Sequence, residues 1–496
     1  MSFELEWVAD GGVTTPEGFA AAATYAGIKT YGAGERRLDL GLLVADRLCA
    51  VAGVFTKNRI CGAPVSVCRE RVASGKAQAL IVNSGCSNVA MGERGLRDAR
   101  AMCELAAERL GIPAELVLVG STGVIGRGLP LDKISAAVPA LTPTSTGGGE
   151  FARAIMTTDT VPKSRAVRIK AGSRSYCIGG VAKGSGMVHP DMATVFGFFT
   201  TDADIAPDRL QHLLREAADV SFNMIDVDMD TSTSDTMLLF ANAAAGGGRI
   251  AAGSPEEVQF SRALTSLATE LARDLARDGE GAKTLIEMEV VGARSLEDAR
   301  RAARTVVSSP LIKTMVTGRD PNLGRVMMAL GRSGAELSEE RISVWIGGQC
   351  AFERGAPTEL DYKAISRAMD APEVKLKADL GLGEHDPGDR AALIAQWCRG
   401  ASRGCRCRQH ARARGAWQRR DDLYAAHARP SAEGGSGWAA EPGQHHGRAV
   451  ADRVGGACRY RGFRAWAVRA SWLDWPGPCQ QSAVASCVSG ERLAFG

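Results

Sequence analysis

The chain has 496 residues, of which 45% are apolar and 23% are charged, so it is long enough to bury two large cores. No stretch approaches the ~20 apolar residues of a membrane-spanning helix, and the acidic start "MSFELEWVADGG" argues against a secretory signal. Thirteen scattered cysteines in so long a chain are typical of a reducing compartment. We therefore expect a soluble, cytoplasmic protein that does not act at a membrane.

In chain order, short β-rich runs that end in Gly, Ser, Thr or Asn alternate with amphipathic helices. This alternation predicts an α/β fold. The expected strands cover residues 49–55, 79–85, 116–123, 194–201 and 236–245, and the expected helices cover residues 95–112, 254–281 and 295–307. Ser254 and Ser295 stand where helix N-caps are expected, each with an acidic residue three positions later.

The composition changes near residue 386. The formal net charge is −5 for residues 1–386 and +9 for residues 387–496. The last 110 residues contain no Lys, Asn or Met, yet they hold six of the eight Trp and six of the thirteen Cys. We interpret this tail as out-of-frame translation, with a natural disordered basic extension as the alternative. Its arginines suit non-specific contact with nucleic acid, but it resembles no folded reader, so no specific nucleic-acid partner is expected.

Thr194 stands where a Gly-rich loop, "AKGSGMVHPDMA", meets an apolar run. A threonine commonly opens a strand, so the position alone does not require chemistry. A Thr hydroxyl becomes a nucleophile when it begins a chain, because its own α-amino group, with a pKa of about 7.7–8.0, then serves as the base. That role requires cleavage after Ala193, which the hydroxyl itself can start by attacking the Ala193 carbonyl.

The segment "GGVAKGSGMVHPDMAT" resembles the cleavage-site signature K-G-[SA]-G-M…P-x-M-A-T of the ornithine acetyltransferase (ArgJ) family. Further stretches resemble that family in the same order: "GGVTTPEGFAAAATYAGIK", "AGVFTKNRICGAPV", "LIVNSGCSN", "VGSTGVIG", "AIMTTDTVPK", "DVDMDTSTSDT", "DGEGAKTLIEMEV" and "DPNLGRVMMALGRSGAE". The resemblance covers roughly residues 10–386. It implies that Thr194 is the nucleophile and that the cut falls between Ala193 and Thr194.

The resemblance also implies an oxyanion site in "GSTGVIG", made of the Thr122 hydroxyl and the Gly123 backbone N–H. Attack on an acetyl carbonyl places negative charge on oxygen, which such donors stabilise. Without the resemblance, a Gly-rich turn after a strand explains the same residues.

The substrate-binding residues that the resemblance implies are Thr157, Lys183, Thr194 and Glu280, with Thr158 as an alternative to Thr157. A lysine suits an amino-acid carboxylate, and a glutamate suits the ammonium group of ornithine. Taken alone, Lys183 reads as a solvated loop residue and Glu280 as a helix-end carboxylate.

The chain departs from the family pattern at several positions. Cys86 and Ser87 replace the usual Asn and Ala, Met229 replaces Gly, and Leu323 replaces Trp. The family ends with a strand-rich segment whose Asn and Thr help to bind substrate, but no Asn occurs here after residue 387. The Asn ligand therefore cannot be carried over to this chain.

No metal or bound cofactor is expected. Asp226, Asp228 and Asp230 alternate as in a calcium loop, but position six lacks Gly and position twelve lacks Glu. Cys405, Cys407 and His410 have no second cysteine pair with zinc-finger spacing.

The resemblance implies a two-lobed fold and a precursor that cuts itself into chains 1–193 and 194–386, followed by the tail 387–496. The two chains are expected to stay together, as a heterotetramer. The implied reaction is ping-pong acetyl transfer from N-acetylornithine to glutamate through acetyl-Thr194, with acetyl-CoA as a further possible donor. Two alternatives stay open: a Thr-nucleophile amidohydrolase or aminopeptidase, and an inactive precursor with an altered end.

Overall fold

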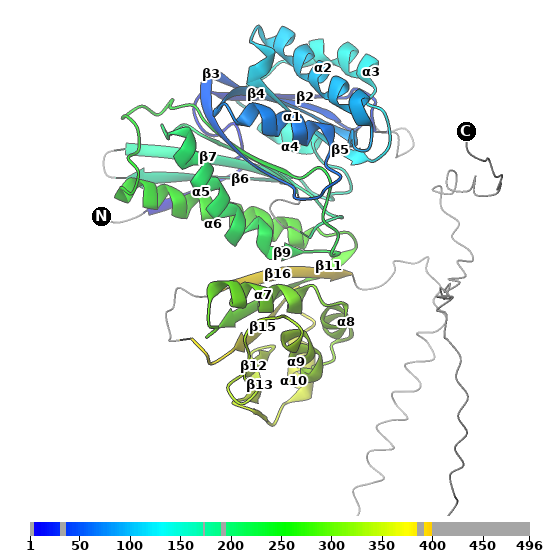
Figure 1. Ribbon diagram of the computed structural model, residues 1–496, viewed down its shortest axis with the longest axis vertical. Coiled ribbons are helices and arrows are strands. Elements are labelled where there is room, and N and C mark those ends of the chain that lie inside the picture. Colours follow the sequence, from blue (N-terminus) through cyan, green and yellow to red (C-terminus); the bar gives the residue numbers. More distant parts are fainter. Residues whose placement is uncertain (1–3, 30–35, 172–173, 190–194, 384–390, 399–496) are drawn as a thin grey trace, which may run out of the picture. The chain divides into compact units, whose positions relative to one another are not determined.

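The computed structural model describes residues 4–29, 36–171, 174–189, 195–383 and 391–398. They form two β-sheets, each with a hydrophobic core and flanking helices, and the α/β class predicted from the sequence is confirmed (Figure 1). Within these ranges, no helix combines the length and the apolarity that crossing a membrane requires.

The first sheet has nine strands and is organised by the sixteen-residue strand β3 (Leu40–Phe55). The first part of β3 pairs with β2 (Phe19–Thr24) and β4 (Lys76–Cys86), and its last part pairs with β10 (Thr236–Ala241). The pairing register breaks between Val44 and Cys49. Strand β3 thus connects a first group of strands (β2, β4 and β5) to a second group (β10, β8, β7, β6 and β1). The other strands are β1 (Glu4–Val8), β5 (Val117–Val124), β6 (Lys163–Ala171), β7 (Arg174–Lys183) and β8 (Phe196–Thr201).

The two groups of strands share one core. Leu80 and Val82 of β4 belong to the same buried cluster as Phe196 and Phe198 of β8, although β4 and β8 are not neighbours in the sheet. Helices α5 (Pro207–Val220) and α6 (Pro255–Arg277) cover the second group, which includes β6 and β7 (Figure 1). The remaining helices of this lobe are α1 (Ala63–Val72), α2 (Gly92–Leu110), α3 (Leu131–Ala137) and α4 (Gly148–Ala154), with 3-10 turns at Ala114–Leu116, Val138–Ala140 and Phe222–Met224.

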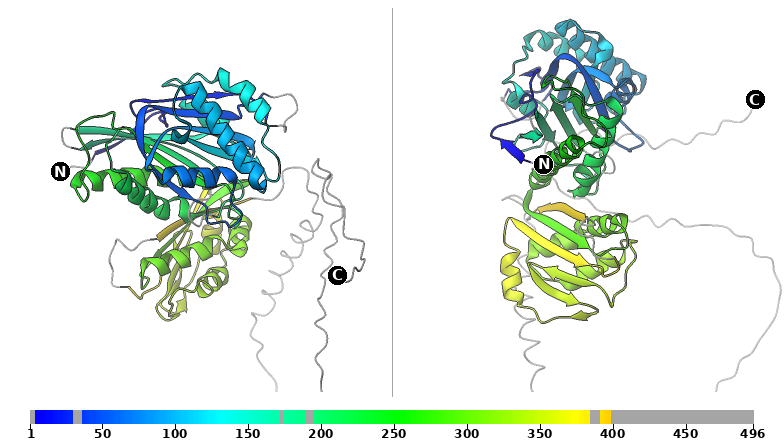
Figure 2. Two further views of the ribbon diagram at one scale, coloured as in Figure 1. Left: turned by 45° about the horizontal axis from the view of Figure 1, so that its top comes forward. Right: turned by 90° about the vertical axis from the view of Figure 1, so that its left-hand side faces the viewer.

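The second sheet has seven strands in the order β14-β13-β12-β15-β11-β16-β9, and α7 packs against β11 and β16. Figure 2 shows this lobe, coloured from green to yellow, from two further sides. Its strands are β9 (Ile225–Asp226), β11 (Ala282–Val291), β12 (Ser343–Ile346), β13 (Gln349–Glu353), β14 (Ala356–Pro357), β15 (Glu373–Asp379) and β16 (Ala391–Cys398). Its helices are α7 (Leu296–Val307), α8 (Pro310–Gly318), α9 (Leu323–Gly331) and α10 (Tyr362–Ala368).

Strand β16 falls inside the range 387–496, so the folded part continues past residue 386, and the other residues of the predicted tail (387–390 and 399–496) lie outside the described residues. Strands β8 and β10, which follow residue 194, belong to the same sheet as β1–β7. The predicted cut therefore falls inside one lobe.

Candidate active site

The predicted nucleophile Thr194 and its neighbour Ala193 lie outside the described residues. Val195, the next residue, is buried, and its carbonyl oxygen accepts a hydrogen bond from the Thr236 N–H at 3.1 Å. Strand β8 then begins at Phe196, opposite Lys183 of β7. The described chain thus resumes at Val195 and continues directly into the buried strand β8.

The predicted oxyanion residues lie side by side at the end of β5. Thr122 is buried and pairs with Ser84 of β4, and Gly123 pairs with Gly85. Gly123 has a φ of 127°, and a Cβ atom there would lie 2.4 Å from the carbonyl carbon of Gly85. Only glycine fits this position, because any side chain would overlap the neighbouring backbone. The role of these two residues stays a prediction.

We expect Thr122→Val to lower the kcat for acetyl transfer by about 10²–10³-fold, because the variant keeps its shape but loses one oxyanion donor. Ser121→Ala is the matched control. The Ser121 hydroxyl is buried next door and has no hydrogen-bond partner among the described residues, so its loss should change kcat less than about twofold. Equal effects of the two substitutions, measured per mole of folded protein, would refute the assignment of Thr122.

Two predicted substrate residues, Thr157 and Lys183, meet at the carboxylate of Asp159. Its Oδ2 accepts the Thr157 N–H at 3.0 Å, and its Oδ1 accepts the Gly184 N–H at 2.8 Å. Lys183 is the last residue of β7, immediately before Gly184. The Thr158 side chain is exposed, and the contacts described here do not decide between Thr157 and Thr158.

Glu280 joins the same group. Its N–H donates to the carbonyl oxygen of Ser185 at 2.8 Å. A Cβ atom on Gly186 would lie 2.6 Å from the Glu280 Oε1, so the carboxylate rests against the Gly186 backbone. The structure therefore brings Thr157, Lys183 and Glu280 together around residues 183–186.

The Lys183 side chain is half-buried and lies near both an aromatic ring and two carboxylates. Its Nζ lies 5.2 Å from the centre of the Phe196 ring, and that ring also borders Gly120 of β5. Burial lowers the pKa of Lys183, although the carboxylates of Asp159 and Asp235 act in the opposite direction. The Phe196 ring therefore lies between Lys183 and strand β5, which carries Thr122 and Gly123.

Asp235 is a buried carboxyl that the sequence analysis missed. Burial raises its pKa well above the usual value, against a hydrogen bond from Ser232 and the charge of Lys183. Among the described residues, its Oδ2 has no hydrogen-bond partner. Asp235 directly precedes Thr236, the residue that bonds Val195, so it lies one position from the strand partner of β8.

A buried charge triad, also missed, supports the substrate group. The Lys163 Nζ lies 2.7 Å from Asp159 Oδ1 and 2.6 Å from Asp278 Oδ2. The three side chains are 1%, 0% and 7% exposed, respectively. Burial raises the pKa of Asp159, but Lys163 and Lys183 outweigh it and hold this pKa below its usual value. The triad ties the loop of Thr157 to the segment that carries Glu280.

Lys29 is a further cation near this group. Burial lowers its pKa to about 8, against the charges of Asp39 and Asp159. A Cβ atom on Gly85 would lie 3.1 Å from the Lys29 backbone N, so Lys29 also adjoins the strand pair that carries Gly123. A single lysine in a loop has no sequence pattern that would have identified it.

Met229 adopts a φ of 65°, a left-handed conformation that glycine enters freely. We expect Met229→Gly to raise the free energy of unfolding by roughly 0.5–1 kcal/mol, because the relief of strain exceeds the added entropy of the unfolded chain. Met328→Gly is the control: this exposed methionine lies inside helix α9, where glycine should cost about 1 kcal/mol. Urea unfolding of both variants measures the difference, and a destabilised Met229→Gly would contradict the strain.

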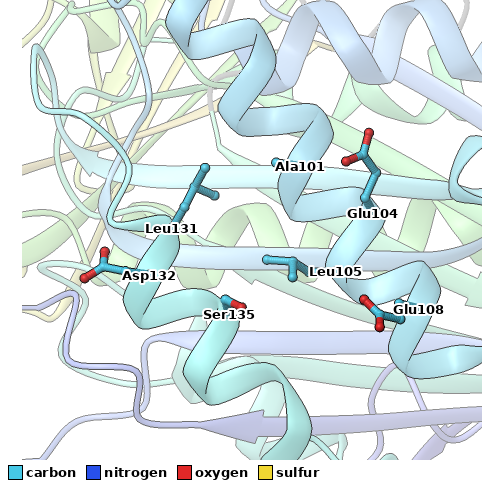
Figure 3. A pocket seen from close by; sticks show the side chains of 7 residues that line it. All are labelled: Ala101, Glu104, Leu105, Glu108, Leu131, Asp132 and Ser135. Carbon is cyan, nitrogen blue, oxygen red and sulfur yellow. The ribbon is translucent and has the colours of Figure 1, made fainter.

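The described residues contain no group of three or more His, Cys, Asp or Glu side chains that is placed to hold a metal ion. Cys405, Cys407 and His410 lie outside them. A groove of about 410 Å³ opens between α2 and α3, lined by Ala101, Glu104, Leu105, Glu108, Leu131, Asp132 and Ser135 (Figure 3). It contains none of the predicted site residues and is not assigned to the reaction.

Known proteins of one family match most of the chain. The family model of the ArgJ family matches residues 20–392. The arginine biosynthesis bifunctional protein ArgJ of Symbiobacterium thermophilum is 50% identical over 384 residues, which make up 77% of this chain and 94% of the relative. The protein of the same name from Dehalococcoides mccartyi is 45% identical, with the same coverage.

One solved structure is an ornithine acetyltransferase from Mycobacterium tuberculosis in complex with ornithine. It is 37% identical and matches 38% of this chain and all of the solved chain, with a TM-score of 0.35. The family match and the two relatives confirm the resemblance that the motifs indicated. The chain belongs to the ArgJ family.

Proposed function

We propose that this chain is a precursor that cuts itself between Ala193 and Thr194 and then transfers acetyl from N-acetylornithine to glutamate by a ping-pong mechanism. Membership of the ArgJ family makes the chain an acetyltransferase, as its motifs predicted. The substrates and the cleavage are supported by one observation above all: Thr157, Lys183 and Glu280 gather around residues 183–186, opposite the start of the strand that follows Thr194.

In the proposed reaction, the freed α-amino group of Thr194 takes the proton from its own hydroxyl, and the oxygen attacks the acetyl carbonyl of N-acetylornithine. The Thr122 hydroxyl and the Gly123 N–H stabilise the oxyanion. The amide C–N bond of N-acetylornithine then breaks, and its nitrogen takes the proton from the α-ammonium group of Thr194. Ornithine departs, and Thr194 carries the acetyl group as an ester. The amino group of glutamate attacks this ester by the same steps in reverse and leaves as N-acetylglutamate.

Two charged side chains would orient the substrates. Lys183 suits the α-carboxylate that both amino acids carry. Glu280 suits the ammonium group of ornithine. The buried Lys163 triad would hold both residues in place, because Asp159 accepts the N–H of Gly184, next to Lys183, and Asp278 lies two positions before Glu280.

The proposal needs no metal and no bound cofactor. We further propose that acetyl-CoA serves as a second donor for glutamate acetylation. We also propose that the two cleaved chains assemble as a heterotetramer in the cytoplasm.

The test incubates the purified protein with N-acetylornithine and glutamate and quantifies ornithine, N-acetylglutamate and acetate by mass spectrometry. We expect ornithine and N-acetylglutamate in equal amounts and two bands on a denaturing gel. Free acetate without N-acetylglutamate would instead indicate an amidohydrolase. One uncut band with no product would indicate an inactive precursor.

A further inference from the structure

The loop between β9 and β10 contacts the described chain on both sides of residues 190–194. On one side the loop bonds residues 187–189. On the other side Thr236, where the loop ends and β10 begins, bonds Val195. The predicted cleavage bond lies between these two attachment points. Residues 190–194 themselves lie outside the described part of the chain.

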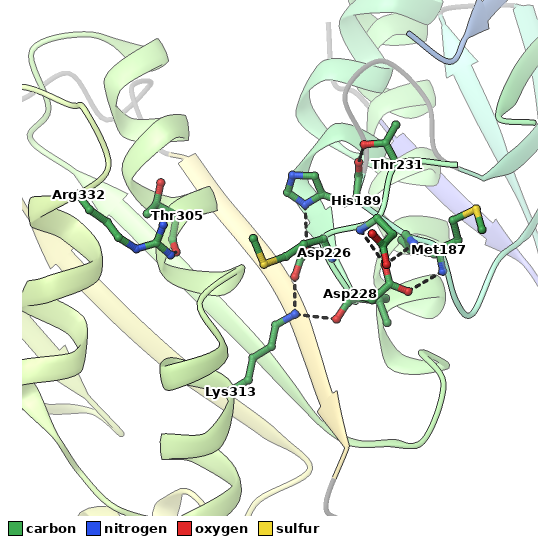
Figure 4. Close-up of polar contacts among 12 residues, drawn as sticks. Met187, His189, Asp226, Asp228, Thr231, Thr305, Lys313 and Arg332 are labelled. Carbon is green, nitrogen blue, oxygen red and sulfur yellow. Dashed lines mark hydrogen bonds and ion pairs between the residues drawn. The ribbon is translucent and has the colours of Figure 1, made fainter. Parts of the chain in front are cut away.

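Asp228 makes the most direct upstream attachment (Figure 4). Its Oδ2 accepts the Met187 N–H at 2.5 Å, and its Oδ1 accepts the Val188 N–H at 2.9 Å. The Val227 N–H donates to the Val188 carbonyl oxygen at 2.7 Å, and the Thr231 hydroxyl donates to the His189 carbonyl oxygen at 2.9 Å. Four hydrogen bonds therefore fix three consecutive residues that end five positions before Thr194.

A buried ion network fixes the loop itself. The carboxylate of Asp226 contacts the His189 Nδ1 at 2.6 Å and pairs with the Lys313 ammonium, which also donates to the Val227 carbonyl oxygen at 2.7 Å (Figure 4). Asp226 and Lys313 are 0% and 2% exposed, and Lys313 belongs to helix α8. The loop is thus attached to a helix of the second lobe and cannot shift without breaking a buried pair.

The downstream attachment is a strand contact. The Thr236 N–H donates to the Val195 carbonyl oxygen at 3.1 Å, and Thr236 pairs with Phe196 in the parallel β8–β10 ladder. Thr231 lies in the loop and Thr236, five positions later, begins strand β10, so one short segment connects the two attachment points. An internal attack of a hydroxyl on the preceding carbonyl depends steeply on such positioning.

We propose that residues 226–236 form a cleavage clamp, in which Asp228 and Thr231 are positioning residues that hold the chain before the scissile bond in register for self-cleavage. The inference rests on the proposed function. It also separates the two reactions of the protein. After cleavage residues 187–193 end the first chain, so the upstream contacts no longer lie beside a bond to be cut, whereas Thr236 continues to hold Val195, the residue that follows the nucleophile.

The test follows cleavage of the full-length chain after pulse-labelled cell-free synthesis, by denaturing gel over time. We expect Asp228→Asn to slow the cut at least tenfold, because an amide offers one acceptor oxygen where the carboxylate accepts three N–H groups, those of Met187, Val188 and Asp230. Thr231→Val, which loses a single hydrogen bond, should slow it about threefold or more. Asp204→Asn is the control, since Asp204 pairs with Arg249 at the surface of the same lobe and should cut at the wild-type rate.

A second measurement separates the clamp from a general effect on folding. Once cut, the Asp228→Asn protein should transfer acetyl with a kcat within twofold of wild type, because the Asp228 carboxylate bonds Met187 and Val188 and none of the predicted oxyanion or substrate-binding residues among the described contacts. Cleavage of both variants within twofold of the wild-type rate, or an equal loss of cutting and transfer, would overturn the clamp. If Asp228→Asn does not fold, Thr231→Val decides the same comparison. A wild-type chain that is never cut would refute the proposed function and the clamp together, whereas fast-cutting variants of a cutting wild type refute the clamp alone.

Discussion

Thr194→Ala is expected to abolish both self-cleavage and acetyl transfer. The variant lacks the oxygen that would attack the Ala193 carbonyl, so no chain beginning at residue 194 forms. It also lacks the oxygen that would carry the acetyl group, so transfer should fall by at least about 10⁴-fold. A denaturing gel and mass analysis of the intact chain measure the first effect, and N-acetylglutamate formation measures the second.

Thr194→Ser is the matched variant, because it keeps a hydroxyl and, once cut, an α-amino group on the same residue. We expect it to retain cleavage and transfer at reduced rates. N-acetylglutamate formation by Thr194→Ala at a rate comparable to wild type would contradict the role of Thr194 as nucleophile. A Thr194→Ala chain that is cut at the same bond would contradict self-cleavage.

Lys163→Met is expected to cause the largest loss of stability, about 3–5 kcal/mol in the free energy of unfolding. The substitution keeps the buried aliphatic volume but leaves the carboxylates of Asp159 and Asp278 without their shared cation. Lys377→Met is the control, because Lys377 is 42% exposed and its Nζ lies 4.0 Å from the Glu289 carboxylate. The control should cost less than about 1 kcal/mol.

The loss in Lys163→Met should depend on pH. Because the folded-state pKa of Asp159 lies below its unfolded value, the wild-type pair stabilises the fold above about pH 4 and loses this contribution as the pH falls further. In the variant the buried carboxyls can take up protons at a higher pH, so the difference from wild type should be largest near neutral pH and shrink in acid. Guanidinium unfolding at pH 5 and pH 7.5 checks this, and a difference that grows toward acid would be contrary to the expectation.

Local signals in the sequence predicted much of the fold. Ser254 and Ser295 cap α6 and α7 as their spacing indicated, each accepting the N–H of the acidic residue three positions later. The apolar run after Thr194 forms the fully buried strand β8. The sixteen-residue length of β3 was missed, because Asp46 and Arg47 interrupt the apolar pattern and the strand was expected only from residue 49. Whether a strand continues through two charges depends on pairing across the sheet, which no single segment records.

The candidate site was predictable only where short motifs carry it. Thr122, Gly123, Thr157, Lys183 and Glu280 stand in such motifs. Thr122 and Gly123 lie together at the end of β5, and Thr157, Lys183 and Glu280 gather around residues 183–186, while the roles of all five stay predictions. The triad was not predictable, since Lys163 and Asp278 are 115 positions apart and no pattern shows that both are buried. Asp235 was missed for the same reason: burial raises its pKa, and the sequence does not show which carboxyl group is buried.

The proposed cut falls between two strands that remain partners. β7 pairs with β8 from Ile178 opposite Thr201 to Lys183 opposite Phe196. On its other side β8 pairs with β10, which in turn pairs with β3. The two cleaved chains would then be joined by the hydrogen bonds between β7 and β8, and they could not dissociate without breaking the sheet. After denaturation, the cleaved protein could not refold as the single-chain precursor does, because two separate chains would have to associate and pair within one sheet. Its persistence in the cell would then rest on a slow rate of opening rather than on an equilibrium.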